Sequence, residues 1–220
     1  MPPVVFTGLS LSQEEARTLL AAEVRPPVKR GDLDQLSGGT VAAIIDGELS
    51  GDSAVPIDEL RRALRRGVKI SGAASVGALR AYEAREEGMV GLGWVYRAYC
   101  SGRIWGTDEI AVIYDPVSYR SLTIPLVNVR FCLERLTTRC GISAEEADHA
   151  MASLKQLSLG KRDRRSIILH LASLLGRERV REMLRLVRPA ETDVKKSDAR
   201  ELLRILRQGR EQLGRTAYSR

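Results

Sequence analysis

Ser75 is the side chain whose neighbours best suit nucleophilic chemistry. It follows an apolar run at 68–70 and small residues at 71–74, and a helix-forming segment begins at Val76. Small residues permit a sharp strand-to-helix turn, because backbone and helix approach closely there. Residues 73–77, Ala-Ala-Ser-Val-Gly, differ from the G-x-S-x-G nucleophile elbow by one methyl group. The pattern equally fits tight packing with a serine helix cap, so both interpretations stay open.

A nucleophilic serine needs a group that accepts its proton. The sequence has two histidines, His149 and His170, and either would have to fold back from the helical half to form a triad. A buried lysine is an alternative base, because desolvation favours the uncharged amine. The adjacent Lys195 and Lys196 are the candidates, although a solvated pair preceding a helix would look the same.

Other polar residues have weaker claims to chemistry. Ser10 lies at a second strand-to-helix bend, where its expected place is at or near the helix cap. Asp46 ends a buried strand, on the edge where open α/β sheets place their sites. Together with Asp108 and Glu109 it could form an acidic metal site, but their order indicates no ligand geometry. We expect neither a metal nor a cofactor.

The pattern of elements predicts an α/β fold followed by helices. Residues 1–124 alternate strands and helices, with strands at 4–6, at 41–45 and from 68, which favours a mainly parallel sheet flanked by helices. Helices are predicted from the Ser12 capping position, at 57–66, from Val76 and at 94–99. Residues 125–220 are predicted to be all-helical and packed on this core, with helices at 126–140, 143–157, 167–175, 177–187 and 198–208.

Charge and composition argue against a nucleic-acid-binding protein and against a membrane protein. Residues 159–220 contain 17 Lys and Arg against 8 Asp and Glu, whereas residues 1–158 contain 18 against 20. The basic third argues for an acidic partner rather than nucleic acid, since it shows no aromatic stacking pattern and no recognition helix. No apolar run is long enough for a membrane span, and no signal peptide is apparent. Three widely spaced cysteines suit free thiols in a reducing cytoplasm.

Nine ordered blocks of the sequence resemble the TfuA-like protein family. They are residues 5–11, 25–27, 30–33, 44–47, 72–81 with Glu83, 88–93, 108–112, 126–130 and 193–199. The resemblance is dense from residue 4 to about 130 and thin from there to the lysine block. The sequence departs from the family pattern at Leu9, where proline is usual, and at 57–59, where a His-Lys-Glu-like segment is common.

The resemblance implies a part in thioamidation of peptide backbones, in the biosynthesis of ribosomally made, post-translationally modified peptides. TfuA-like proteins work beside YcaO enzymes, which activate an amide oxygen with ATP. The family is described as a serine-lysine hydrolase of a thiocarboxylated ThiS-like carrier protein, which releases sulfide for the YcaO site. The TfuA-like protein would contact the precursor peptide only through the YcaO enzyme that binds it.

The resemblance assigns the serine of its G-x-x-S-x-G block to Ser75 and the lysine of its D-x-K-x-x-D-A block to Lys195. The backbone N–H groups of Val76 and Gly77 would hold the oxyanion. Expected supporting residues are Thr7, Ser10, Asp46, Arg80, Glu83 and Asn128, with Arg80 and Glu83 forming an i,i+3 pair. A non-catalytic adaptor that strengthens peptide binding by the YcaO enzyme is the alternative.

Overall fold

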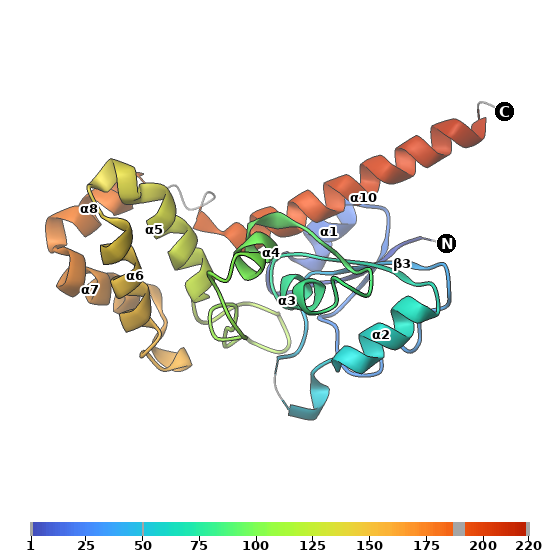
Figure 1. Ribbon diagram of the computed structural model, residues 1–220, viewed down its shortest axis with the longest axis horizontal. Coiled ribbons are helices and arrows are strands. Elements are labelled where there is room, and N and C mark those ends of the chain that lie inside the picture. The colour runs from blue at the N-terminus through green and yellow to red at the C-terminus, as the bar shows by residue number, and fades with distance from the viewer. Residues whose placement is uncertain (1, 50, 187–191, 219–220) are drawn as a thin grey trace. The chain divides into compact units, whose positions relative to one another are not determined.

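The computed structural model describes residues 2–49, 51–186 and 192–218 (Figure 1), and the chain divides into two compact units. The first unit consists of residues 1–104 together with 195–220, and the second of residues 105–194. These units differ from the predicted division after residue 124. The difference arises because the chain leaves the sheet earlier than expected and its last helix returns to the first unit.

The first unit is built on a five-stranded parallel sheet, which confirms the predicted fold class. Strand order is β2-β1-β3-β4-β5, and every pairing is parallel. The strands are β1 (Val4–Phe6), β2 (Glu23–Arg25), β3 (Val41–Ile44), β4 (Lys69–Gly72) and β5 (Val90–Gly91). The helices are α1 (Gln13–Leu19), η1 (Gly51–Ser53), α2 (Ile57–Arg65), α3 (Val76–Glu83), α4 (Gly93–Cys100) and α10 (Val194–Tyr218), which from Lys195 onward belongs to this unit.

Alternating side chains of the strands pack against two layers of helices. Phe6 and Ile44 face a core shared with α2 and α3, whereas Val5 and Ala43 face a core shared with α1 and α10. Figure 1 shows α10 running beside α1, with α2 and α3 on the other face of the sheet. Both faces are therefore covered, as a parallel sheet requires.

The strand order creates a switch point between β1 and β3. The chain moves outward from β1 to β2 and then returns to place β3 on the other side of β1. In doubly wound sheets, ligands bind outside the carboxyl ends of the strands at such a point. Here the residues that follow these two carboxyl ends are Thr7 to Ser10 after β1 and Ile45 to Asp46 after β3.

The second unit is helical in its regular structure, as predicted. It contains α5 (Leu126–Cys140), α6 (Ala144–Leu154), η2 (Leu159–Lys161), α7 (Arg164–Leu175) and α8 (Arg177–Leu186). Ser143 and Glu146 form a capping box that starts α6. The helices share one apolar core, which includes Leu133, Met151 and Leu171. Residues 108–113 form no strand, and Tyr114 makes an isolated bridge with Ser121.

Within the described residues, no helix combines the length and the apolar character that a bilayer crossing requires.

Candidate functional site

The bend between β4 and α3 holds Ser75 in an uncommon backbone conformation. The Ser75 N–H donates to the Ala73 carbonyl at 2.9 Å, and the intervening Ala74 has a φ of 70°. A bond across one residue with positive φ is the geometry of the γ-turn, which is rare and strained for a residue other than glycine. Ser75 occupies the N-cap position of α3, but its side chain makes no capping hydrogen bond. The hydroxyl is therefore not committed to the helix end.

Two glycines let α3 start directly against the sheet. A Cβ at Gly77 would overlap the Ile44 carbonyl of β3, and one at Gly72 would overlap the Gly77 carbonyl. The Ala73 N–H donates to the same Ile44 carbonyl at 3.1 Å. This confirms the expectation that small residues are needed on both sides of the bend, because backbone meets backbone there.

The two backbone N–H groups expected to hold an oxyanion differ in availability. Gly77 donates its N–H to the Ile45 carbonyl at 3.2 Å, so an oxyanion would compete with that carbonyl. For Val76, no N–H hydrogen bond is found in the part of the chain that the structure describes. Val76 is thus the stronger candidate donor of the two.

Lys195 lies in the first turn of α10, within the same unit as Ser75. Both side chains are buried, each residue being 3% exposed. Helix α10 begins at Val194, earlier than the predicted start at Asp198, which places Lys195 on the helix itself. The next turns of α10 carry Ala199, Leu202 and Leu203 into the apolar cluster that also contains Ala73 and Ala74. The serine bend and the lysine helix therefore share one core.

Lys196 points to a different environment from its neighbour. Its ammonium pairs with Glu15 of α1 at 2.8 Å, and its side chain is 37% exposed. Arg200 contacts the same carboxylate at 2.5 Å. Lys196 thus fastens α10 to α1 at the surface, whereas Lys195 is enclosed.

Asp198 anchors the start of α10 to the start of α4 and was not among the predicted site residues. Its carboxylate accepts the Trp94 N–H at 2.9 Å and the Val95 N–H at 2.8 Å. A Cβ at Gly93 would overlap this carboxyl group, so glycine is required there. Burial raises the pKa of Asp198 to about 6. The only sequence signal was its place in the D-x-K-x-x-D-A block, three residues after Lys195.

Thr7, Ser10 and Asp46 come together at the switch point. The buried Asp46 carboxylate accepts the N–H groups of Gly8, Leu9 and Ser10 at 3.0, 2.9 and 2.8 Å. The Ser10 hydroxyl donates to it at 2.5 Å, and the Thr7 hydroxyl donates to the Leu11 carbonyl at 2.7 Å. Ser10 therefore has its proton committed and is a poor rival to Ser75.

Gly47 connects this carboxylate cluster to the serine bend. A Cβ added there would lie 3.0 Å from the Val76 Cγ1 atom, so the backbone after Asp46 lies against the first residue of α3. The predicted pair of Arg80 and Glu83 forms on the same helix. The Arg80 Nε atom is buried and finds no hydrogen-bond partner among the described residues.

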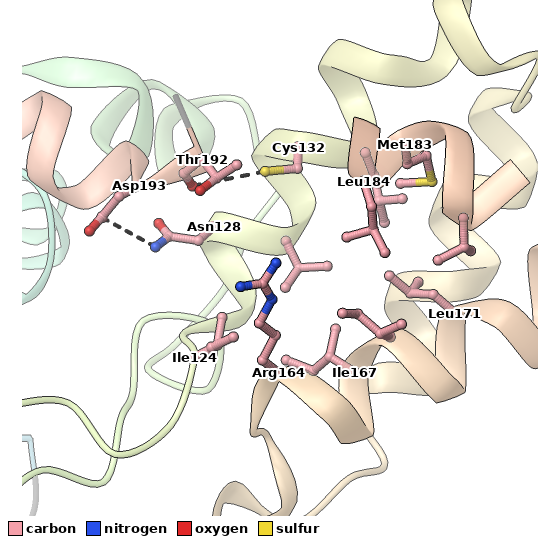
Figure 2. Close-up of a pocket in the computed structure, with 14 residues that line it drawn as sticks. Ile124, Asn128, Cys132, Arg164, Ile167, Leu171, Met183, Leu184, Thr192 and Asp193 are labelled. Carbon is pink, nitrogen blue, oxygen red and sulfur yellow. Dashed lines mark hydrogen bonds between the residues drawn. The ribbon is translucent and has the colours of Figure 1, made fainter. Parts of the chain in front are cut away.

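The remaining candidates belong to the second unit. Asn128 donates from its amide to the Asp193 carboxylate at 3.2 Å and lines a pocket there (Figure 2). The buried Glu109 pairs with Arg130 at 2.8 Å and with Lys155 at 2.7 Å, and Asp108 pairs with Arg162 at 2.7 Å. Among described residues, no cluster of three or more His, Cys, Asp or Glu side chains suits a metal ion.

Comparison with known families gives a match over more than half of the chain. The family described as TfuA-like protein matches residues 46–163, a range that includes Asp46, Ser75 and Asn128 and ends before Lys195. A comparison with curated proteins finds no match. The matched family is associated with thioamidation and, in general, with a YcaO partner.

Proposed function

Because the chain belongs to the TfuA-like family, we propose that it is an accessory hydrolase of peptide-backbone thioamidation. Its substrate is a ThiS-like carrier protein whose C-terminus ends in a thiocarboxylate. Its product is sulfide, which a partner YcaO enzyme uses to replace the oxygen of a peptide amide. Ser75 is the nucleophile and Lys195 the base.

The observation that carries this proposal is the burial of both side chains in one unit. Ser75 ends the β4 bend, Lys195 begins α10, and the residues beside them pack in a common apolar cluster. A lysine taken out of water favours its uncharged form, which can accept a hydroxyl proton. The enclosure of Lys195, set against the surface ion pair of Lys196, supports Lys195 as the base.

The proposed reaction has two balanced steps. The Ser75 oxygen attacks the thiocarboxylate carbon while Lys195 takes the hydroxyl proton, and the Val76 N–H stabilises the oxyanion. Collapse of the tetrahedral intermediate breaks the carbon–sulfur bond while the protonated Lys195 gives its proton to the departing sulfur, which leaves as hydrosulfide, and an acyl-enzyme remains. The neutral Lys195 then removes a proton from water, which attacks the ester, and it returns this proton to the Ser75 oxygen as the carrier leaves as a carboxylate. The strained bend keeps the Ser75 oxygen in one position through both steps.

A mass assay tests the nucleophile directly. The thiocarboxylated carrier is incubated with the protein in the absence of any YcaO enzyme, and its intact mass is followed until it becomes the carboxylate. We expect Ser75→Ala to lower the rate by at least about a thousandfold. Ser173→Ala, which changes an exposed serine of α7 whose hydroxyl donates to the His170 carbonyl of the same helix, serves as the serine control and should retain the activity. An unaltered rate in Ser75→Ala would rule out the nucleophile.

A non-catalytic adaptor is the second candidate function. The observation that favours it is the Gly77 N–H, which already donates to the Ile45 carbonyl, so that only Val76 of the two expected oxyanion donors has an unpaired N–H within the described residues. An adaptor releases no sulfide from the carrier without the YcaO enzyme, but lowers the KM of that enzyme for its peptide. The assay above therefore separates the two functions.

A further inference from the structure

The helical unit contains a pocket that plays no part in the proposed hydrolysis. It has a volume of about 340 Å³ and lies among α5, α7 and α8. That volume falls in the range of small-molecule sites, which combine an apolar lining with a few polar groups. All of its lining residues lie between 124 and 193, within the second unit.

Figure 2 shows that the pocket has two chemically different sides. Leu171, Met183 and Leu184 lie on one side, and Asn128, Thr192 and Asp193 lie on the other. On the polar side, the Asp193 carboxylate accepts the Asn128 amide. An apolar group would therefore occupy one side of the pocket and a polar group the other.

Arg164 supplies the charge that decides which polar group fits. Its guanidinium points from the first turn of α7 into the space between the two sides (Figure 2). The Arg164 side chain is exposed, and in the described part of the chain it makes no hydrogen bond or ion pair. Its planar fork matches a carboxylate with two parallel hydrogen bonds. A phosphate would place a second negative charge near Asp193, so a single carboxylate is the better match.

Cys132 adds no negative charge to the pocket. Its thiol lies 3.9 Å from the Thr192 carbonyl, and burial raises its pKa to about 11. The thiol is therefore protonated at neutral pH and behaves as a small apolar group. Asp193 remains the one carboxylate among the lining residues, which leaves the region of Arg164 open to an anion.

We propose that this pocket binds an apolar monocarboxylate, with the carboxylate on Arg164 and the apolar group against Leu171, Met183 and Leu184. A medium-chain fatty acid and the C-terminal apolar residue of a peptide present the same chemistry. The inference does not depend on the hydrolase activity, because neither the proposed nucleophile Ser75 nor the proposed base Lys195 lines the pocket.

Calorimetric titration of the full chain tests the charge requirement. Octanoate, octanol and octylammonium share one apolar chain and differ in the head group. Octanoate should bind at least about tenfold more tightly than the other two. Arg164→Met should remove that preference, whereas Arg165→Met, a change of the neighbouring exposed arginine outside the pocket, should retain it. Equal binding of the three probes, or no binding, would overturn the proposal.

A second pair of variants tests the location. Leu184 is 43% exposed and lines the pocket, so Leu184→Trp should fill it and abolish octanoate binding without unfolding the chain. Leu169→Trp alters an exposed leucine of α7 outside the pocket and should change nothing. Binding that survives Leu184→Trp would place the ligand elsewhere and overturn the assignment.

Two peptides distinguish the sources of the carboxylate. One ends in a free leucine carboxylate and the other in leucine amide. Binding of the free acid alone identifies a chain terminus as a ligand, whereas binding of octanoate alone identifies a small-molecule acid; both results support the pocket chemistry. Equal binding of the acid and the amide contradicts the role of Arg164.

Discussion

At the scale of single residues, the two neighbouring lysines offer a direct test of the base. Lys195→Arg keeps the positive charge but replaces an amine that can lose its proton with a guanidinium that stays protonated. We expect this change to lower thiocarboxylate hydrolysis by at least about a hundredfold. Lys196→Arg is the matched control, because arginine can still pair with Glu15, and it should retain the wild-type rate. If Lys196→Arg lost activity and Lys195→Arg did not, Lys196 would be the base instead of Lys195.

Asp198 should make folding stability depend on pH. Its carboxyl ionises near 3.8 in the unfolded chain, but burial raises its pKa to about 6 in the folded chain. Between these values the folded state retains a proton that the unfolded state has lost. The protonated Asp198 therefore adds to the free energy of unfolding. This stabilisation is fully present below the pKa of the unfolded chain, and about 3 kcal/mol of it is lost as pH rises through the pKa of the folded chain.

Urea unfolding of the wild type and Asp198→Asn at pH 4 and pH 7 measures this contribution. The wild type should lose about 2 kcal/mol more than the variant over that interval, because asparagine does not titrate and part of the stabilisation is already lost at pH 4. Parallel curves for the two proteins would contradict the raised pKa. The comparison cancels the other carboxyl groups, which titrate in both.

At the scale of elements, the contact of α3 with β3 predicts a low tolerance for side chains. Gly77→Ala places a methyl group on the Ile44 carbonyl, and backbone cannot yield as a flexible side chain can. We expect a loss of about 2–4 kcal/mol in unfolding free energy and reduced activity, because the Ser75 bend must shift.

Gly209→Ala provides the control for Gly77→Ala within the same unit. Gly209 lies in α10, and an added Cβ would meet nothing within 4 Å. Because alanine favours helix more than glycine, this change should stabilise the protein by about 0.5–1 kcal/mol. Thermal and urea unfolding would report both variants, and an equal loss in the two would refute the packing argument.

The sequence predicted helices and strands well where the residues of the element itself determine its type and its ends. The helix predicted at 126–140 has those bounds, and the helix predicted from residue 143 begins at Ala144, after the Ser143 cap. Strands β2 and β5 were missed because they span three and two residues and lack an apolar run. Their structure comes from pairing with β1 and β4, which local sequence does not encode.

In the candidate site, too, the sequence predicted local features but not contacts between distant segments. Small residues around Ser75 indicated a bend, and the family resemblance suggested Lys195 as its partner, an assignment that stays a prediction. The anchoring of Asp198 by Trp94 and Val95 joins segments more than 100 positions apart, and no local pattern reports such a contact. The sequence also did not distinguish the N–H of Val76 from that of Gly77. The Gly77 N–H donates to the carbonyl of Ile45, which lies far away in the sequence, just after β3.

At the scale of the whole molecule, the uneven charge predicts that binding to the partner enzyme depends on salt. Residues 159–220 carry 17 basic against 8 acidic side chains, and α10 exposes Arg204 and Arg207. We expect the Kd for the YcaO enzyme to rise at least about tenfold from low salt to about 0.5 M, because salt screens exposed charges. Titration in an interferometer or calorimeter measures this change. A salt-independent Kd would indicate an apolar interface instead.

The return of α10 to the first unit has a consequence for protein synthesis. A ribosome makes all five strands and the Ser75 bend before it begins residues 105–194, and Lys195 follows only after them. In the proposed Ser75–Lys195 mechanism, a nascent chain that has already folded its sheet would thus have the nucleophile without its base. Sulfide release would then begin only after α10 has left the exit tunnel.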